Sequence, residues 1–294
     1  MNNSNNTPFV SVVIATKNEE KNIENCIKSI KNQTYPSDKI EMIVVDNNSS
    51  DKTVEIAKKF SEKVYTKGPK RSSQLNLGVK NANGKYIVYP DADMILSEKV
   101  IEECVKKCEK EDCIALYIPE VIIGKNFWIK VRNFERSFYD ETCIDAVRFV
   151  SKDGFLGING FDEEIDFGAD DWDFNRLIKT QGKVDIINSP LYHNEGEFNL
   201  KAYLSKKGHY SQYLDKYIEK WGEGDLIIKK QFGAWYRLFG VYMEEGKWKR
   251  FISKPHLALG VSFLRFLVGL VFIINKIEIS TKIYCNLRGH RYDW

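Results

Sequence analysis

The sequence lacks several signals that would place it in a common protein class. The loop after its first predicted strand carries no G-x-G-x-x-G run, and this absence argues against a dinucleotide-dependent dehydrogenase. Residues 1–7 are polar and have neither the charged start nor the apolar centre of a secretory signal. We therefore expect a disordered N-terminus at residues 1–7 and a catalytic part that stays in the cytoplasm.

Cysteine and histidine are scarce, and their spacing does not indicate a structural zinc site. The chain has six cysteines and four histidines. Cys104 and Cys108 lie four residues apart, with Cys113 nearby, and no histidine is adjacent, whereas zinc sites favour tighter C-x-x-C pairs. Thiols stay reduced in the cytoplasm. We therefore expect these cysteines to be small buried hydrophobic residues.

Two strand–loop–helix repeats open the chain. In each, an apolar strand leads into a polar loop and then into a helical segment: residues 10–15, 16–20 and 23–30, then 41–45, 46–51 and 53–60. Such repetition predicts a parallel sheet with right-handed crossovers, whose ligands bind beyond the carboxyl ends of the strands.

A pair of acids follows a third apolar run. Asp91-Ala92-Asp93 comes directly after residues 86–89, so the strand is expected to end by presenting two carboxylates on one face. Hard oxygen ligands two residues apart suit Mg²⁺ or Mn²⁺ and leave positions open for diphosphate oxygens. Solvated acids in a turn are the alternative. We expect residues 91–93 to converge with the polar loops at 16–20 and 46–51.

Four segments together resemble the inverting family 2 glycosyltransferases of the GT-A fold. They stand in the family's order over about residues 8–200 and read SVVIATKNEE, MIVVDNNSSDKT, GPKRSSQLNLGVKNANGKYIVYPDADM and GINGFDEEIDFGADDWDFNRLIKTQG. The resemblance implies an α/β fold with a Rossmann-like, mostly parallel sheet flanked by helices. It also implies transfer of a sugar from a UDP- or GDP-sugar with inversion at the anomeric carbon, dependent on Mn²⁺ or Mg²⁺.

The resemblance implies a set of residues that bind the nucleotide sugar. They are Thr16, Asn18, Glu19, Asp46, Arg71, Asp91 and Asp93. Asp46 would read the base edge, because a carboxylate can accept the imide N–H of uracil, although guanine offers a similar donor. A helix cap or an Asx-turn is the alternative for Asp46. Arg71 would pair with the diphosphate or hold an acid near the base.

The same resemblance assigns the catalytic base to a second acidic run. Asp170-Asp171-Trp172-Asp173 opens a predicted helix and matches the family's Glu-Asp-x-Asp pattern, with Asp170 in place of the usual Glu. Asp171 falls on the position of the base and Asp170 is the second choice. Asp173 is expected to face solvent or to cap the helix. Acids in a first helical turn are also favoured by the helix dipole, which is the structural alternative.

His193 follows a short predicted strand at residues 184–187. Related GT-A enzymes often have a histidine here as a further metal ligand or diphosphate contact, so the predicted metal ligands are Asp91, Asp93 and His193. A hydrogen-bonded structural histidine is the alternative. Arg148 is a further candidate for contact with an anion.

The C-terminal part of the chain is basic and contains a long apolar segment. Residues 201–294 hold 17 Lys and Arg against 8 Asp and Glu, whereas residues 1–200 hold 27 against 33. Residues 257–274 are apolar except for Arg265, and a basic cluster at 247–251 precedes them. Their length is borderline for a membrane span, and a central Arg costs about 3 kcal/mol on insertion scales. An interfacial or re-entrant helix, a true span and a buried soluble helix therefore remain alternatives.

These patterns predict a GT-A catalytic domain at residues 8–200, a helical extension completing the active site at 201–246, and membrane-associating, partly hydrophobic helices at 247–294. We expect a peripheral or anchored enzyme at the inner face of the cell membrane. It would transfer a single sugar to a hydroxyl or phosphate of a lipid-linked or membrane-proximal acceptor. No nucleic-acid partner is expected.

The same fold has two other possible functions. A processive polysaccharide synthase is disfavoured, because residues 231–235 lack the Arg of the Q-x-x-R-W signature of such enzymes and no array of spanning helices is predicted. A non-catalytic nucleotide-sugar or membrane-binding protein is the remaining alternative, and the intact acids at Asp91, Asp93 and Asp171 argue against it.

Overall fold

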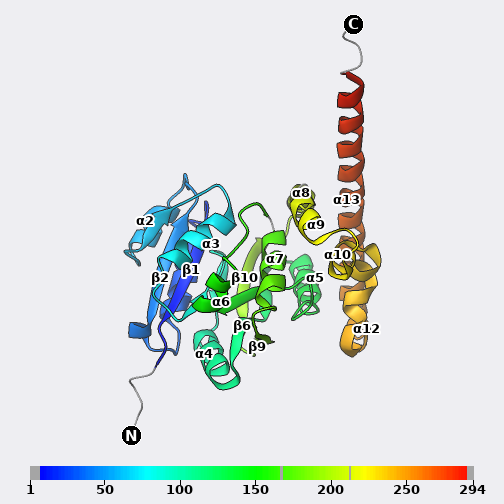
Figure 1. Cartoon of the computed structure of the whole chain (residues 1–294). Helices are drawn as coiled ribbons and strands as arrows, with labels where there is room; N and C mark the ends of the chain where they lie inside the picture. Colours follow the sequence, from blue (N-terminus) through cyan, green and yellow to red (C-terminus); the bar gives the residue numbers. More distant parts are fainter. Residues whose placement is uncertain (1–6, 166–167, 212, 290–294) are drawn as a thin grey trace. The chain divides into compact units, whose positions relative to one another are not determined.

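The computed structural model describes residues 7–165, 168–211 and 213–289. It divides into two compact units, Met1–Gly196 and Glu197–Trp294 (Figure 1). Residues 1–6 of the predicted disordered N-terminus lie outside the described residues. The two units are described separately below.

The first unit is built on a seven-stranded sheet with the strand order β3-β2-β1-β4-β8-β6-β9. Parallel pairing joins β1 to β2 and β4, β2 to β3, and β6 to β9, whereas β8 runs antiparallel between β4 and β6. The mostly parallel sheet predicted from the repeats is therefore confirmed. The strands are β1 Val10–Thr16, β2 Ile40–Asp46, β3 Val64–Thr66, β4 Tyr86–Val88, β6 Cys113–Tyr117, β8 Val147–Ser151 and β9 Lys183–Ile186.

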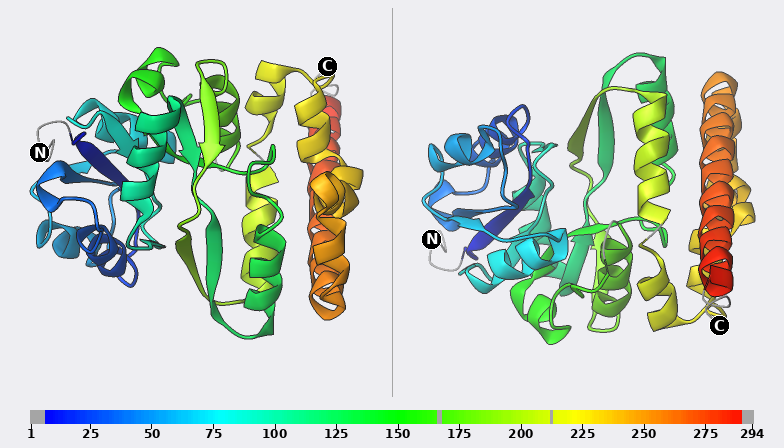
Figure 2. Two further views of the ribbon diagram at one scale, coloured as in Figure 1. Left: turned by 90° about the horizontal axis from the view of Figure 1, so that it is seen from below. Right: turned by 90° about the horizontal axis from the view of Figure 1, so that it is seen from above.

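Helices cover both faces of this sheet (Figure 2). The helices of this unit are, in chain order, α1 Ile23–Lys31, η2 Ser37–Lys39, α2 Thr53–Lys58, α3 Arg71–Lys80, α4 Val100–Glu111, α5 Phe127–Arg136, α6 Lys152–Gly157 and α7 Ala169–Ile178. Of these, α5 packs against strand β7 Glu120–Lys125 of a second, smaller sheet. Alternate residues of β1 enter the two cores: Val12 packs with α1 and α4, and Val13 with α3, α6 and α7. Burial on both faces explains why this strand is a continuous apolar run.

The predicted role of the cysteines is confirmed in α4 and at the start of β6. Cys104, Cys108 and Cys113 are buried and free, and Cys104 and Cys108 lie on the face of α4 that packs into the core. Burial raises the pKa of the Cys104 thiol well above its ordinary value, because an apolar environment disfavours the thiolate.

A second, three-stranded sheet has the order β5-β10-β7. Its strands are β5 Met94–Leu96, β7 Glu120–Lys125 and β10 Leu191–Glu197. β5 begins directly after Asp93, and its antiparallel pairing with β10 sets Met94 opposite His193. This register brings Asp93 and His193, which are far apart in the sequence, close together.

The second unit is helical. Its elements are α8 Leu200–Ser211, α9 Asp215–Trp221, α10 Leu226–Phe232, the π-helix η3 Tyr236–Gly240, α11 Val241–Met243, η4 Glu244–Gly246, α12 Trp248–Ile252 and α13 Pro255–Gly289. α13 packs against α8, η3 and α12. Within the described part of the chain, one stretch, Pro255–Asn275 of α13, is long and apolar enough to cross a membrane.

Two glycines allow close contact with β1. Gly78 lies in α3 and Gly84 in the turn that follows it. A Cβ on Gly78 would lie 2.2 Å from Cγ1 of Val13, and one on Gly84 would lie 2.5 Å from the backbone nitrogen of Ser11. Both glycines therefore have a structural role, because no larger side chain fits at either position.

Gly84→Ala is expected to lower the free energy of unfolding by about 1–3 kcal/mol, because the added methyl group meets backbone that cannot move without disturbing β1. Urea unfolding followed by circular dichroism measures the change. Gly157→Ala is the matched control, since its Cβ would find its nearest neighbour at 3.4 Å, and it should change stability by less than about 1 kcal/mol. Equal effects of the two substitutions would contradict this account.

Candidate active site

The carboxyl ends of β1, β2 and β4 meet at one edge of the large sheet. Thr16 and Asp46 are register partners at the ends of β1 and β2, and Asp91 bridges to Ala15. The buried side chain of Gln74 in α3 donates hydrogen bonds to the backbone oxygens of Thr16 and Val45, at 3.0 and 2.5 Å. The expected convergence of the three polar loops is confirmed.

The loops after β1 and β2 are joined by hydrogen bonds. Asn18 has a left-handed backbone conformation, and its Oδ1 accepts from the backbone of Ser50 at 2.9 Å. The backbone nitrogen of Glu19 donates to Oγ1 of Thr53 at 2.7 Å. Asp46 accepts from the backbone nitrogen of Ser49 at 2.8 Å, a local side-chain-to-backbone bond that reaches one residue further than an Asx-turn.

Beside these loops, two arginines pair with three acids. Nε of Arg71 lies 2.8 Å from Oδ1 of Asp91, and its Nη1 lies 3.0 and 3.1 Å from carboxylate oxygens of Asp170 and Asp171. Nη2 of Arg148 lies 3.3 Å from Oδ2 of Asp91 and 3.6 Å from Oδ2 of Asp171. Asp91, from the end of β4, and Asp171, from the first turn of α7, therefore share one site.

Charge dominates the energetics of this cluster. Burial alone would raise the pKa of the Asp91 carboxyl, but the charges of Arg71 and Arg148 outweigh that effect and hold its pKa below the ordinary value. Nη2 of Arg71 and Nη1 of Arg148 are buried without a hydrogen-bond partner among the described residues. Unsatisfied guanidinium groups at this position can bind an anionic ligand.

A third group of polar residues surrounds His193 in β10. Its Nε2 lies 3.1 Å from Oδ2 of Asp93, and its Nδ1 lies 2.8 Å from Oε1 of Glu120 in β7. The other oxygen of Glu120 lies 3.2 Å from Nε of Arg136. Oδ1 of Asp93 is buried and has no hydrogen-bond partner among the described residues. The three predicted metal ligands thus fall into two neighbouring groups, because Asp91 turns toward the arginines.

The charges of this third group stabilise one another. Burial would lower the pKa of His193, but its contacts with Asp93 and Glu120 raise it to about 10. Burial would raise the pKa of Glu120, yet Arg136 and His193 hold it well below its ordinary value. His193 therefore keeps its positive charge and Glu120 its negative charge, in part because the two side chains are paired with each other.

The acids of α7 differ in exposure. Asp170 is 2% exposed, and its Oδ1 accepts a hydrogen bond from the backbone of Gly168 at 2.8 Å. Asp171 is only half-buried. The prediction that Asp173 faces solvent is wrong, because Asp173 is 1% exposed. It lies one turn from Ala169 on the inward face of the helix, next to the buried ring of Phe174.

Sequence reasoning missed Glu120 and Arg136 and treated Arg148 as only one of several possible contacts. Glu120 is a charged residue directly before a short apolar run, Val121-Ile122-Ile123, which is a weak signal. Its partner His193 stands on another strand of the same small sheet, and no local pattern relates the two. Only the pairing of β7 with β10 brings them together.

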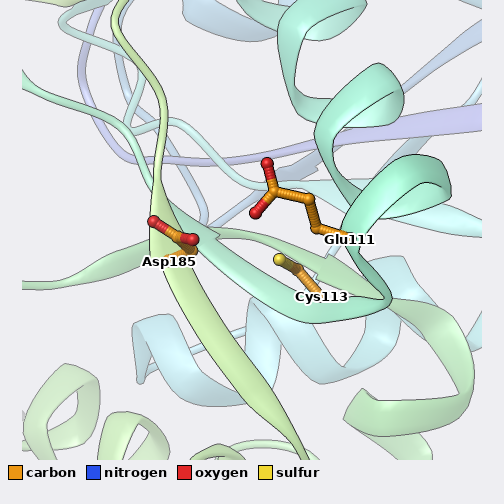
Figure 3. A group of neighbouring side chains, drawn as sticks. All are labelled: Glu111, Cys113 and Asp185. Atoms are coloured by element: carbon orange, nitrogen blue, oxygen red, sulfur yellow. The ribbon is translucent and has the colours of Figure 1, made fainter.

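One group of three side chains among the described residues has the proximity of metal ligands. Atoms of Glu111, Cys113 and Asp185 lie within 4.8 Å of one another (Figure 3). Nζ of Lys183 lies 2.6 Å from Glu111 and 3.1 Å from Asp185, and Nζ of Lys107 lies 3.0 Å from Asp185. The lysines already balance both carboxylates, and the group stands at the amino ends of β6 and β9. We assign it as a structural ion-pair cluster.

Comparison with known proteins identifies relatives over most of the chain. A β-monoglucosyldiacylglycerol synthase of Trichormus variabilis is 26% identical over 252 residues, which cover 77% of this chain and 53% of the relative. The chain thus spans about half the length of that relative. An uncharacterized glycosyltransferase of Methanocaldococcus jannaschii is 30% identical, with 97% of this chain and 95% of the relative covered.

Solved structures agree on the fold. A mannosyltransferase from Pyrobaculum calidifontis, in complex with GDP-Man and Mn²⁺, superposes with a TM-score of 0.63 at 18% identity, covering 92% of this chain and 87% of that one. TarS of S. aureus in complex with UDP-GlcNAc gives a TM-score of 0.52 at 15% identity, covering 93% and 91%. The fold is therefore GT-A-like.

The family model for glycosyl transferase family 2 matches residues 11–166, which is more than half of the chain. This segment contains both polar loops, Arg71, the two acids after β4 and Arg148. The chain belongs to glycosyltransferase family 2.

Proposed function

We propose that this glycosyltransferase moves a single sugar, with inversion, from a nucleotide-diphosphate donor to a hydroxyl or phosphate of a lipid-linked or membrane-proximal acceptor. The observation that carries the proposal is the shared site of Asp91 and Asp171, which pair with the same two arginines. Inversion needs a base on the side of the sugar opposite the leaving diphosphate. Acids from two elements with two arginines between them support that arrangement.

In the proposed reaction, Asp171 takes the proton of the acceptor hydroxyl as that oxygen bonds to the anomeric carbon. The bond from the anomeric carbon to the donor phosphate breaks, and its electron pair leaves with the nucleoside diphosphate. Asp171 is preferred to Asp170 because it is half-buried, whereas Asp170 is almost fully enclosed and already accepts from the backbone of Gly168. Arg71 and Arg148 would offset the charge that grows on the diphosphate.

The residues present fit a divalent cation. Oδ1 of Asp93 is a buried carboxylate oxygen without a hydrogen-bond partner among the described residues, and hard cations such as Mn²⁺ or Mg²⁺ bind such oxygens. We propose Asp93 and Asp91 as ligands. His193 would be a third ligand once its Nε2 has released its proton, or a diphosphate contact as an imidazolium. A bound cation would supply positive charge to the leaving diphosphate.

Glu120 supports this assignment by fixing the ring of His193. One oxygen of Glu120 faces Nδ1 of His193 and the other faces Arg136, so the ring is held with Nε2 toward Asp93. A carboxylate behind a ligating histidine sets both its orientation and its tautomer.

The donor and acceptor are proposed from the loops and from the relatives. Thr16, Asn18, Glu19 and Asp46 are proposed to line the nucleotide site, since they stand together at the carboxyl edge of the sheet. Structural neighbours were solved with GDP-Man and with UDP-GlcNAc, and we propose a UDP- or GDP-sugar as the donor here. A relative named as a β-monoglucosyldiacylglycerol synthase favours a lipid-borne acceptor.

We further propose that residues 247–294 associate with the inner face of the cell membrane and that residues 8–200 form the cytoplasmic catalytic domain. The basic cluster before α13 and the apolar segment Pro255–Asn275 support this. That residues 201–246 complete the active site stays a prediction.

Asp171→Asn is expected to leave donor binding intact and to lower turnover by about 10²–10⁴-fold, because the amide cannot accept the acceptor proton. Turnover is measured as nucleoside diphosphate released from a panel of UDP- and GDP-sugars with polyprenyl phosphate. Asp153→Asn, at an exposed acid in α6, is the matched control and should retain activity. Full activity in Asp171→Asn, with loss in Asp170→Asn, would move the base to Asp170. Binding of a donor by the wild-type chain without any turnover would favour the non-catalytic alternative.

Removal of divalent cations with EDTA is expected to abolish turnover, and excess Mn²⁺ or Mg²⁺ should restore it. Electron paramagnetic resonance of added Mn²⁺ measures binding independently of turnover, and Asp93→Asn should weaken that binding by at least about tenfold. Turnover that persists in EDTA would refute the dependence on a metal.

Glu120→Ala is expected to destabilise the first unit by about 2–4 kcal/mol, because Arg136 and His193 lose a buried counter-charge. Urea unfolding checks this value. The control is Glu111→Ala, which removes an exposed partner of Lys183 and should leave the unfolding midpoint unchanged. Equal shifts in the two variants would show that the His193 group is not a stabilising network.

A further inference from the structure

Exposed apolar side chains are concentrated in the second unit. Of the 16 large apolar side chains that are strongly exposed among the described residues, 14 lie in this unit, and only Phe127 and Leu156 lie in the first. A surface this apolar is uncommon on a soluble protein and marks a site of interaction.

Many of these side chains form one face of α13. They are Leu259, Phe263, Phe266, Leu270, Ile273 and Ile274. Their spacing of three and four residues places them on the same side of the helix. The other exposed positions between them, Ser262 and Gly269, are uncharged. The face runs for about 22 Å at 1.5 Å per residue.

The charge in this segment lies on the opposite side of the helix. Arg265 is 5% exposed, and it shares its buried face with Val261, Leu264 and Val268. The sequence suggested that a central arginine would oppose contact with lipid. In the folded unit the arginine points into protein, and the outer face of α13 carries no charge from residue 257 to residue 274.

We propose that this face of α13, defined by Leu259, Phe263, Phe266, Leu270, Ile273 and Ile274, lies against the acyl chains of an anionic bilayer, with the helix in the plane of the membrane surface. The proposal deepens the membrane association proposed above and is independent of glycosyl transfer.

Charge complementarity selects the lipid. α12 precedes α13 and exposes Lys249 and Arg250, and Lys254 follows it. Trp248 and Ile252 are exposed one turn apart on the same side of α12. Basic side chains attract anionic headgroups, and tryptophan is enriched at the membrane interface, so α12 suits the headgroup layer at one end of the apolar face.

A second copy of the chain fits this face less well. Helix pairs that associate in water through a 4-3 repeat flank the apolar seam with charged residues, which set the partner and the register. The positions that flank this seam include Gly260, Leu267 and Gly269, none of which is charged. The face is wide and uniformly apolar, as a lipid-facing surface requires.

The packing of α8 favours an in-plane helix over a span. α8 lies along α13, where a Cβ on Gly208 would lie 3.0 Å from Val271 and Nδ2 of Asn275 donates to the backbone oxygen of Gly208 at 2.9 Å. Lys206 and Lys207 stand next to this contact. In the middle of the apolar stretch, Val261, Leu264 and Val268 are likewise buried against this unit. A spanning α13 would therefore carry the helices packed on it, with their polar residues, into hydrocarbon.

The test is flotation of the full-length chain, made by cell-free translation without detergent in the presence of vesicles of phosphatidylcholine and phosphatidylglycerol. We expect the wild-type chain to float with these vesicles and to float less with phosphatidylcholine alone. The double variant Phe263→Ser, Phe266→Ser should bind at least about tenfold more weakly. The matched control, Phe127→Ser with Leu156→Ser, removes two exposed apolar side chains of the first unit and should float as the wild type does.

Orientation is tested on the same samples with a C-terminal epitope tag. An in-plane helix leaves the tag open to added protease, so complete digestion is expected. Protection of the tag would overturn the in-plane assignment. Equal flotation of wild type and the Phe263/Phe266 variant would overturn the lipid-facing surface, as would a wild-type dimer that the variant converts to monomer without loss of flotation. Flotation is measured without nucleotide sugar, so a failed transfer reaction leaves this test unaffected.

Discussion

The pairing of two guanidinium groups with three carboxylates is the constraint on which the site depends. Arg71 comes from α3, Arg148 from β8, Asp91 from the end of β4, and Asp170 and Asp171 from α7. Removing any of these charges from water is costly unless an opposite charge replaces the lost hydration. The helices and strands that carry the acids can therefore pack together only because the arginines lie between them. The same ion pairs stabilise this edge of the sheet and form the site.

The strands, helices and meeting point of the polar loops could be predicted from sequence because they follow from local patterns. β1 is apolar throughout because both of its faces are buried, and parallel strands must end at the same edge. The contact of Glu120 with His193 and the burial of Asp173 could not be predicted. The first depends on how two distant strands pair, and the second on which side of α7 turns inward.

The second unit shows why composition alone left three alternatives for its apolar segment. A count of charges cannot tell on which side of a helix an arginine stands. Arg265 lies on the packed face of α13. Residues 257–274 therefore divide into a side that faces protein and an uncharged outer side. The spacing of three and four residues separates the two sides of the helix. Only the position of the neighbouring helices shows which side faces protein.

The antiparallel direction of β8 has a consequence for how such a site can vary. Because β8 runs against its neighbour β4, its early residues reach the edge where parallel strands end, and the backbone oxygen of Arg148 accepts from Tyr89 at 3.1 Å. Arg148 is thus held by sheet hydrogen bonds, whereas Asn18 and Glu19 belong to the loop after β1. Insertions or substitutions in that loop could change recognition of the nucleotide while the guanidinium of Arg148 stays in place.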